Sequence, residues 1–560
     1  MLLSGSDIIV RVLIEQGADT VFGYPGGQII NVYDSLYKYQ DEINHILTAH
    51  EQGATHAADG YARAPGKVGV GISTSGPGAT NLVTGIATAY LDSVPLVAIC
   101  GNVPTTQIGT DSFQEIDITG VTLPITKHNY FVGSVEQLAD TLREAFRLAK
   151  SGRPGPVLID VPKDVQIAMC EYTECPPVQA DEPMAAKDIR IKEAAAIINS
   201  ANRPFIYFGG GLITADAQEE LLALADKIDA PIGCSLMGLS GVPTEHPRFL
   251  GMQGMHGHYA SSMAMHQADL IISLGVRFND RVTGNRTKFA VGTNIVHIDV
   301  DGSELSKTVD ATVGLRGDIK KTLNKLLPLI NATENPDWQR KIAQLRQDES
   351  TLDTRDGMTP RNAILAVNKH LGDNTAVATD VGQHQMWAAQ HIKIQFARQL
   401  ITSGGLGTMG FGLPAAMGAQ LARPKSRAIS LSGDGGFKMT GSELFTIASN
   451  KIPVIAIVFN NSGLGMIRQL QTVQFNKRFT ACELPGYMDF VKYAEAFGIK
   501  GEHVDTPEAL AEALTKAMAK DEPYVIEVAI NPKNMVQPMV APGLGINDYV
   551  KFVKEEKITK

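Results

Sequence analysis

Two polar residues in the last third of the chain stand where β-strands are expected to end. Asp434 lies in a glycine-rich turn after the apolar run 427–431, and Asn461 follows the apolar run 453–459. Consecutive parallel strands of a doubly wound sheet bring their carboxyl ends to one edge, so we expect these side chains to converge. Together with a loop carbonyl at Gly463 they would form a half-filled oxygen site, which Mg²⁺ completes with water and phosphate ligands. The glycines that would let the backbone approach a diphosphate are Gly433, Gly435 and Gly436.

A third candidate, Glu51, lies near the start of the chain. It stands at the predicted junction between a short strand over 45–50 and a helix over 52–62. A carboxylate there interacts favourably with the positive end of the helix. Taken alone, Glu51 could be a capping or surface residue, and Asp434 and Asn461 could belong to ordinary turns. The position of Asp434 and Asn461 at two strand ends favours a metal-binding site over ordinary turns.

The elements that would position these residues repeat in the order strand, glycine-rich turn, helix. Apolar runs such as 67–72, 94–99 and 156–160 alternate with helical stretches such as 135–148 and 216–228. This alternation predicts an α/β protein built from parallel sheets with helices on both faces.

Polar, aperiodic stretches at 172–187 and 349–361 indicate linkers between domains. We therefore expect three doubly wound parallel-sheet domains followed by a segment that could be a tail or a lid. In the third domain, the helix after Asp434 is expected over about 442–449. The predicted bounds are 1–172, 188–345 and 360–531 for the domains and 532–560 for the C-terminal tail.

Composition and charge narrow the class of protein. The 560 residues carry a net charge of −9 and no basic block, which argues against nucleic acid as a partner. No apolar stretch approaches the roughly 20 residues that span a bilayer, and no signal peptide is evident at the start. The five cysteines include no CxxC pair, so neither a disulfide framework nor a zinc site is indicated. These features predict a cytoplasmic protein.

The segments around the candidate residues resemble the thiamine-diphosphate (ThDP) enzyme superfamily. The resemblance lies in 50–63 taken with Gly433-Asp434-Gly435 and Asn460-Asn461. In that superfamily a glutamate of the pyrimidine-binding domain hydrogen-bonds the aminopyrimidine and so promotes loss of the thiazolium C2 proton, which creates a carbon nucleophile. Glu51 matches this glutamate, and Met409 matches the apolar residue that props the cofactor in its bent shape. The residues that match the diphosphate-side loop are Gln383 and His384.

Within this superfamily nearly the whole chain resembles the catalytic (large) subunit of acetohydroxyacid synthase, also called acetolactate synthase. The resemblance implies decarboxylation of pyruvate and transfer of the two-carbon unit to a second 2-oxo acid. The product would be 2-acetolactate or, from 2-oxobutanoate, 2-aceto-2-hydroxybutanoate, in the first common step of branched-chain amino-acid biosynthesis. The three domains would be pyrimidine-binding, central FAD-type and diphosphate-binding. The matching segments are 24–27, 73–81, 111–115, 126–129, 152–164, 254–257 and 539–543.

The middle domain resembles the part of the biosynthetic synthases that holds FAD. Gly209, Gly210 and Gly211 follow a predicted strand and open a helix, although they lack the final glycine of a dinucleotide fingerprint. Arg277 and Asp299 lie in two further stretches that match the flavin-binding ones. The resemblance therefore implies FAD in a structural role. The alternative is a domain that keeps these glycines but binds no flavin.

The resemblance also assigns substrate residues. The carboxylate of the second 2-oxo acid needs a cation, and Arg281 matches the family's arginine, whose fork suits bidentate binding. Two residues depart from the family pattern. Leu470 stands where a tryptophan usually favours 2-oxobutanoate, which predicts a weaker preference. Asn279 replaces an aspartate near the flavin stretch, which puts FAD affinity in doubt. The other residues that match the substrate surroundings are Phe113, Gln114, Lys163 and Met255.

The resemblance further implies partners. The cofactor would lie between the pyrimidine domain of one subunit and the diphosphate domain of its neighbour in a homo-oligomer, and a small regulatory subunit is expected. Rival interpretations are a catabolic, flavin-free acetolactate synthase and a related ThDP lyase, hydrolase or acetyltransferase with another substrate. A non-catalytic binding subunit is disfavoured because a scaffold has no need for Glu51, Asp434 and Asn461 together.

Overall fold

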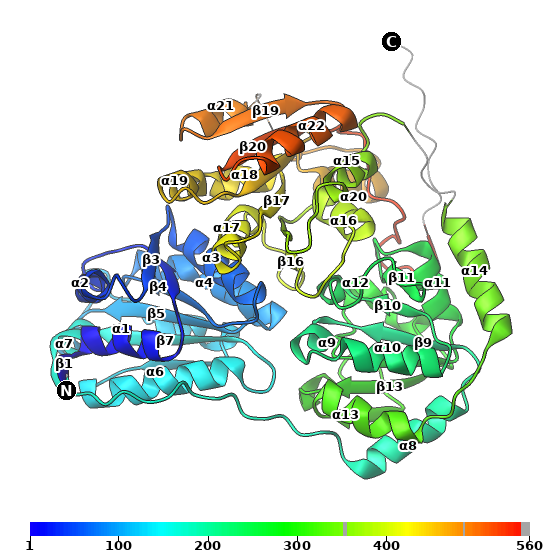
Figure 1. The fold of residues 1–560 in the computed structure, drawn as a ribbon, viewed down its shortest axis with the longest axis horizontal. Helices are drawn as coiled ribbons and strands as arrows, with labels where there is room; N and C mark the ends of the chain where they lie inside the picture. Colours follow the sequence, from blue (N-terminus) through cyan, green and yellow to red (C-terminus); the bar gives the residue numbers. More distant parts are fainter. Residues whose placement is uncertain (351–355, 485, 487, 550–560) are drawn as a thin grey trace.

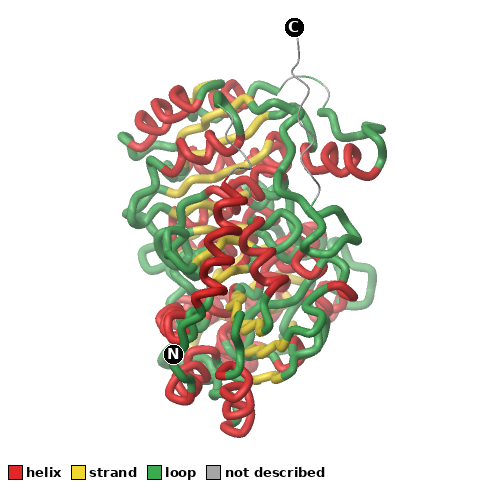
Figure 2. The backbone as a smooth tube through the Cα atoms, turned by 90° about the vertical axis from the view of Figure 1, so that its right-hand side faces the viewer, coloured by secondary structure: helices red, strands yellow, loops and turns green. Residues whose placement is uncertain are grey.

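The fold was obtained as a computed structural model that describes residues 1–350, 356–484, 486 and 488–549. Three six-stranded parallel sheets make up the molecule, which confirms the predicted fold class. Figure 1 shows the three units in chain order, blue, green and yellow to red, and Figure 2 shows the strands enclosed by helices. The predicted linker 172–187 contains no helix or strand, whereas positions 351–355 and 550–560 of the predicted linker and tail lie outside the described residues.

The N-terminal unit carries its sheet in the order β3-β2-β4-β5-β7-β6, and a short antiparallel pair, β1 and β8, lies beside it. Helices α1 and α6 pack together on one face, and α3 and α4 pack together on the other. The elements are β1 Leu2–Ser4, α1 Gly5–Glu15, β2 Thr20–Gly23, α2 Ile30–Lys38, β3 Asn44–Leu47, α3 Glu51–Arg63, β4 Gly69–Ser73, α4 Pro77–Asp92, β5 Leu96–Asn102, α5 Ile118–Thr122, β6 His128–Phe131, α6 Val135–Lys150, β7 Pro156–Pro162, α7 Lys163–Ile167 and β8 Met169–Glu171.

The middle unit has the sheet order β11-β10-β9-β12-β13-β14 with a separate apolar core on each face. Strand β9 and its neighbour β12 are buried along their whole length, which their continuous apolar sequences explain. The elements are α8 Asp188–Asn199, β9 Pro204–Phe208, α9 Gly210–Thr214, α10 Gln218–Lys227, β10 Ile232–Cys234, β11 Phe249–Met252, α11 Tyr259–Gln267, β12 Leu270–Leu274, α12 Asp280–Thr283, β13 Asn294–Asp299, β14 Val313–Arg316, α13 Ile319–Leu326 and α14 Pro336–Ser350.

The C-terminal unit has the sheet order β16-β15-β17-β18-β20-β19, so the strands that precede the candidate residues lie side by side. The elements are α15 Pro360–Asn368, β15 Ala376–Thr379, α16 Gln383–His391, β16 Leu400–Thr402, α17 Gly412–Ala422, β17 Ala428–Gly433, α18 Asp434–Thr440, α19 Leu444–Ser449, β18 Ile455–Asn460, α20 Gly465–Gln474, α21 Phe490–Glu495, β19 Lys500–Val504, α22 Pro507–Met518 and β20 Tyr524–Ala529.

One apolar core joins the first and third units, because α3 packs along α17. Small residues make this close approach possible. A Cβ on Gly60 would lie 2.1 Å from the carbonyl oxygen of Ala415, and one on Gly418 would lie 1.9 Å from that of Ala57. Both distances are far below van der Waals contact. Glu51, the first residue of α3, is thereby tied to the third unit.

The sequence-based prediction placed a helix over about 442–449 but missed the separate helix that precedes it. A helix, α18, begins at Asp434 itself, and the predicted stretch 442–449 corresponds to a 3₁₀ turn and α19 that follow it. Two glycines in the first turn weaken the local helix propensity. Burial of Phe437 in the shared core supplies the stabilisation that propensity does not indicate. Among the described residues, no helix is long and apolar enough to cross a membrane.

Candidate active site

The ends of β17 and β18 bring the predicted metal ligands together. The Asp434 Oδ2 atom accepts a hydrogen bond from the Gly463 N–H at 3.0 Å, and the Asn461 Oδ1 atom faces the same N–H at 3.2 Å. Parallel pairing of β17 with β18 places both loops at one edge of the sheet. Gly463 therefore links the two candidate oxygen ligands.

Asp434 has the electrostatics of a cation ligand. Its side chain is almost fully buried, at 4% exposure, and burial raises its pKa to about 6 although the N–H groups of Gly435 and Gly463 lower it. A divalent cation would favour the charged form. The residues present thus fit Mg²⁺, which needs few protein ligands.

The start of α16 lies beside this edge. Gln383 begins α16, and its Oε1 atom lies 3.4 Å from the Asn461 Nδ2 atom. The ring of His384 packs against Gly433, where a Cβ would lie 2.8 Å from the Nδ1 atom. The Nε2 atom of His384 is buried and has no hydrogen-bond partner among the described residues, and burial lowers the pKa of this histidine to about 4. An unpartnered ring nitrogen beside the glycine turn fits a bound diphosphate.

Met409 approaches the same turn from a different loop. A Cβ on Gly435 would lie 3.5 Å from the Met409 Cε atom and 2.6 Å from a methyl of Leu464. Gly435 therefore leaves a narrow cradle between these two side chains, which a larger residue would fill.

The sequence analysis assigned no role to Asp380. Its side chain anchors the loop that carries Met409. Its fully buried carboxylate accepts hydrogen bonds from the N–H groups of Val381, Gly410 and Gly412. Burial raises its pKa to about 6 although those N–H groups lower it. A Cβ on Gly436 would lie 2.3 Å from its Oδ1 atom. The signal was present, because Asp380 follows β15 as Asp434 follows β17.

Glu51 is the first residue of α3 and is 8% exposed. Its Oε2 atom accepts a hydrogen bond of 2.9 Å from Asn81 Nδ2, and its Oε1 atom would lie 3.1 Å from a Cβ on Gly78. Burial, and then the charge of Glu51, raises the pKa of Tyr33. Asn81, which sequence reasoning placed in a matching segment without a role, therefore orients this carboxylate.

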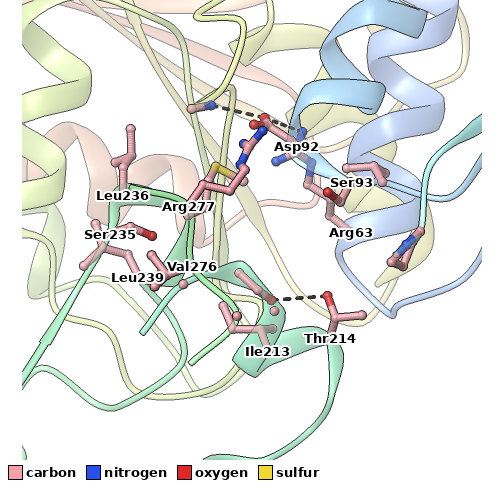
Figure 3. Close-up of a pocket in the computed structure, with 18 of the residues that line it drawn as sticks. Arg63, Asp92, Ser93, Ile213, Thr214, Ser235, Leu236, Leu239, Val276 and Arg277 are labelled. Carbon is pink, nitrogen blue, oxygen red and sulfur yellow. Dashed lines mark hydrogen bonds and ion pairs between the residues drawn. The ribbon is translucent and has the colours of Figure 1, made fainter. Parts of the chain in front are cut away.

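The predicted FAD residues line one cavity of about 710 Å³, which is in the usual range for small-molecule sites. It lies between all three units, and Figure 3 shows Arg277 of the middle unit extending toward Asp92 and Arg63 of the first. Arg277 Nη2 donates to the carbonyl of Leu91 at 2.6 Å. The other predicted FAD residues that line the cavity are Gly209, Gly210, Gly211 and Asp299.

The chemistry of the cavity wall fits a large polar ligand. His256 Nδ1 and Gln253 Oε1 are buried without a hydrogen-bond partner among the described residues. Burial raises the pKa of Asp299 to about 6. Gly209 and Gly211 pack closely against Gly275, because a Cβ on Gly209 would lie 2.4 Å from the Gly275 carbonyl oxygen and one on Gly211 would lie 2.7 Å from the Gly275 Cα atom.

The predicted substrate residues fall into two groups. Met255, Arg281 and Leu470 line the cavity, and the Arg281 Nη1 atom lies 3.8 Å from the Met255 Sδ atom. Phe113 and Lys163 do not line it: the Phe113 side chain is 84% exposed, and Lys163 Nζ donates to the Gly27 carbonyl. Gln114 stands beside Phe113 in the left-handed region, with φ of 62°, and its carbonyl oxygen would lie 2.9 Å from a Cβ on Gly76. The single chain therefore does not bring the two groups together.

Comparison with known proteins gives the same assignment for each unit. Three regions match thiamine pyrophosphate enzymes: 3–121 the N-terminal TPP binding domain, 191–326 the central domain and 380–528 the C-terminal TPP binding domain. Thiamine pyrophosphate (TPP) is another name for ThDP.

Curated relatives match over nearly the whole length. The chain is 44% identical to the acetolactate synthase isozyme 2 large subunit of Escherichia coli, with 97% of this chain and 98% of that protein covered. It is 43% identical to a probable acetolactate synthase large subunit of Methanocaldococcus jannaschii (100% and 97% covered). It is 42% identical to the acetolactate synthase large subunit of Lactococcus lactis (98% and 96%).

Proposed function

The chain belongs to the family of acetolactate synthase large subunits within the thiamine pyrophosphate enzymes, and from this premise we propose how its residues serve that activity. The chain decarboxylates pyruvate and joins the two-carbon unit to a second 2-oxo acid, giving 2-acetolactate. The observation that carries this conclusion is the match over nearly the full chain, at 41–44% identity, to relatives of one kind. The chain contains both the candidate metal ligands Asp434 and Asn461 and the hydrogen-bonded pair Glu51 and Asn81, which supports the proposal that it is catalytic.

We assign the third unit to the diphosphate end of the cofactor. Asp434, Asn461 and Gly463 would hold Mg²⁺, and the ion would neutralise the diphosphate. Gln383 and His384 would bind the diphosphate from α16, where the unpartnered His384 Nε2 atom is available for a hydrogen bond. The glycines that leave room for the diphosphate are Gly433, Gly435 and Gly436.

Glu51 would act on the aminopyrimidine end. When bound, ThDP supplies a nucleophilic carbon and an electron sink for decarboxylation of a 2-oxo acid. Asn81 donates a hydrogen bond to the Oε2 atom of Glu51. The Oε1 atom is therefore the one that would carry the proton shared with the pyrimidine nitrogen. Met409 would support the cofactor from the loop that Asp380 anchors.

The second substrate would lie at the cavity end near α20. Arg281 would bind its carboxylate, and its side chain is 66% exposed, so the guanidinium is accessible. Met255 and Leu470 would form the apolar wall. FAD, held by Gly209–Gly211, Arg277 and Asp299, would fill the rest of the cavity in a structural role.

A homo-oligomer would complete the site. Phe113, Gln114 and Lys163 lie away from the cavity of their own chain, and the exposure of Phe113 suits a residue covered by a second copy. We infer that these residues face the diphosphate unit of a neighbouring subunit. The relatives are named large subunits, which supports a small regulatory partner. We also propose that the protein acts in the cytoplasm.

The first test is acetolactate formation from pyruvate by purified protein with ThDP and Mg²⁺, with and without FAD. Activity that requires FAD would support both the synthase activity and the assignment of FAD to the cavity. Activity without FAD would favour the flavin-free, catabolic alternative. No acetolactate under either condition would overturn the substrate assignment while leaving the cofactor assignment to be tested by ThDP binding.

A further inference from the structure

A buried glutamate on a neighbouring strand supports the candidate Mg²⁺ turn. Glu527 lies on β20, which pairs with β18, and its side chain is only 5% exposed. Its Oε1 atom accepts a hydrogen bond of 2.7 Å from Nδ2 of Asn460. Asn460 is the last residue of β18 and directly precedes Asn461. Glu527 therefore contacts the residue next to a proposed metal ligand without reaching the metal position itself.

The side-chain amide of Asn460 bridges Glu527 to the turn. Its Oδ1 atom accepts a hydrogen bond of 2.9 Å from the N–H of Ser462. A carboxylate only accepts and a backbone N–H only donates, so the two ends of this amide cannot be exchanged without losing both bonds. Ser462 has φ of 54°, a left-handed conformation that a serine seldom adopts without support. Asn460 supplies that support.

The charge of Glu527 is held by specific partners. Its Oε2 atom accepts a hydrogen bond of 3.1 Å from the N–H of Phe490 and lies 3.2 Å from His503 Nδ1. The Nε2 atom of His503 lies 3.2 Å from Asp489 Oδ1. Both ring nitrogens of His503 already face carboxylates. The direct hydrogen bonds from Asn460 and Phe490 are therefore the contacts that fix the two oxygens of Glu527.

We propose that Glu527 is a positioning residue for the metal turn. Through Asn460 it fixes the backbone at Ser462 and so places Asn461 and Gly463 for Mg²⁺. The inference rests on the proposed function, which assigns Mg²⁺ to this turn. Hydrogen-bond partners behind metal ligands typically change metal affinity by 10- to 100-fold when they are removed.

Glu527→Gln tests the proposal with little change in volume. Glutamine offers one oxygen and one NH₂ group, whereas both carboxylate oxygens of Glu527 accept from the protein. The NH₂ group would therefore oppose either the Asn460 amide or the Phe490 N–H. A second variant, Asn460→Ala, removes the bridge and leaves Glu527 paired with Phe490 and His503. The matched control is Asp489→Asn, which changes a carboxylate that contacts His503 but not Asn460.

Three quantities are measured on the full-length protein: the Mg²⁺ dissociation constant with ThDP present, kcat at saturating Mg²⁺, and the Tm without cofactors. The Tm shows whether each variant folds. The Mg²⁺ dissociation constant comes from the protein fluorescence change in a direct titration. We expect it to rise about 10-fold in Glu527→Gln and in Asn460→Ala. The kcat at saturating Mg²⁺ should stay within about 2-fold, because the correctly placed turn is still reached once the ion is bound. Asp489→Asn should retain the wild-type constant.

An unchanged Mg²⁺ constant in Asn460→Ala overturns the proposal, and this variant decides the question if Glu527→Gln does not fold. An equal rise in Asp489→Asn, or a loss of kcat that saturating Mg²⁺ does not restore, would show a general structural role and also overturn it.

A further variant, Asp434→Ala, distinguishes failure of the proposed metal site from failure of the positioning role of Glu527. If this variant binds Mg²⁺ normally, the proposed metal site fails; if it loses Mg²⁺ while Glu527→Gln and Asn460→Ala do not, only the positioning role fails.

Discussion

At the scale of single residues, the carboxylate of Glu51 is the sharpest test of the proposed chemistry. Asn81 fixes one of its oxygens, and glutamine at position 51 would keep an acceptor for Asn81 while losing the transferable proton. We expect Glu51→Gln to lower kcat by about 10²- to 10⁴-fold, as removal of an acid–base group does. The measurement is acetolactate formation from pyruvate at saturating ThDP and Mg²⁺.

The control for this variant is Glu42→Gln, which changes an exposed carboxylate that pairs with Arg11. Its kcat should equal that of the wild type. ThDP binding by Glu51→Gln should persist, because the diphosphate end is held by other residues. A Glu51→Gln variant with kcat within 10-fold of the wild type would contradict the assigned role.

In the proposed site, Leu470 would control the choice of second substrate. It lies on α20 and lines the cavity together with Arg281 and Met255. A tryptophan there would add a flat apolar wall for the extra methylene of 2-oxobutanoate, which is worth about 1–3 kcal/mol in a good pocket. We expect Leu470→Trp to raise the ratio of acetohydroxybutanoate to acetolactate at least about 10-fold when both 2-oxo acids compete.

Product ratios at equal concentrations of pyruvate and 2-oxobutanoate give the measurement. Leu470→Met is the matched variant, since it keeps an apolar side chain of similar volume without an aromatic plane. Its ratio should stay near that of the wild type. An unchanged ratio in Leu470→Trp would place the second substrate elsewhere.

At the scale of elements, a buried glutamate connects the start of α3 with the third unit. The Glu443 carboxylate accepts hydrogen bonds from the N–H groups of Ala49 and His50, just before Glu51. A Cβ on Gly53 would lie 1.9 Å from its Oε1 atom, so α3 begins directly against this carboxylate. Burial raises the pKa of Glu443 to about 7, although the N–H of Ala49, the hydroxyl of Thr446 and the N–H of His50 lower it.

The raised pKa of Glu443 makes stability depend on pH. A glutamate in the unfolded chain has a pKa of about 4.3, so the folded protein binds this proton more tightly than the unfolded protein does. The contribution of Glu443 to stability is therefore fully present below about pH 4.3 and is lost as the pH rises through about 7. Glu443→Gln removes this titration.

The Tm of the wild type minus that of Glu443→Gln should consequently fall between pH 5 and pH 8, by roughly 2–4 °C. Scanning calorimetry at several pH values measures it. The comparison is independent of any constant penalty that glutamine introduces by offering one acceptor instead of two. A difference that is flat, or that grows with pH, would show that Glu443 is ionised in the folded protein throughout this range.

The elements also show where sequence reasoning reaches its limit. Strand ends and the turns at Asp434 and Asn461 were predictable, because alternating apolar runs and glycines mark them locally. The start of α18 was not, because its two glycines argue against a helix and only burial of Phe437 favours it. Glu443 was missed for a related reason, and so were the distant partners of Asp380, although the position of Asp380 after a strand was a signal in the sequence. The acceptor roles of both carboxylates depend on N–H groups from segments that only the fold brings close.

At the scale of the whole molecule, buried charged residues connect the three units, in addition to the apolar core that the first and third units share. Arg63 of α3 pairs with Asp92 at 3.0 Å, and Asp92 in turn accepts the N–H groups of Gly404 and Gly405 from the third unit. Arg277 of the middle unit reaches the carbonyl of Leu91 beside them. The family resemblance predicted which residues bind FAD, but the sequence could not show that their cavity is closed by all three units. The predicted domain bounds themselves stay predictions.

If FAD binds this cavity as proposed, it would stabilise the whole chain and not the middle unit alone. A ligand that binds only the folded protein stabilises it by about 2.7 kcal/mol at 100 times its dissociation constant. Because the proposed FAD cavity is lined by all three units, opening any unit would release the ligand. We therefore expect saturating FAD to raise the Tm of a single cooperative transition by several degrees and to slow proteolysis in the linker 172–187.

Arg277→Met should lose most of this shift, because it removes the cation that links the middle unit to Leu91 at the cavity wall. Arg340→Met is the matched control, since Arg340 is exposed, pairs with Asp337 and does not line the cavity. Its Tm shift with FAD should equal that of the wild type. A shift confined to one of several separate transitions would show that the flavin holds only the middle unit. The absence of any shift would favour a flavin-free synthase, in which the cavity serves substrate alone and Asn279 marks the loss of flavin affinity.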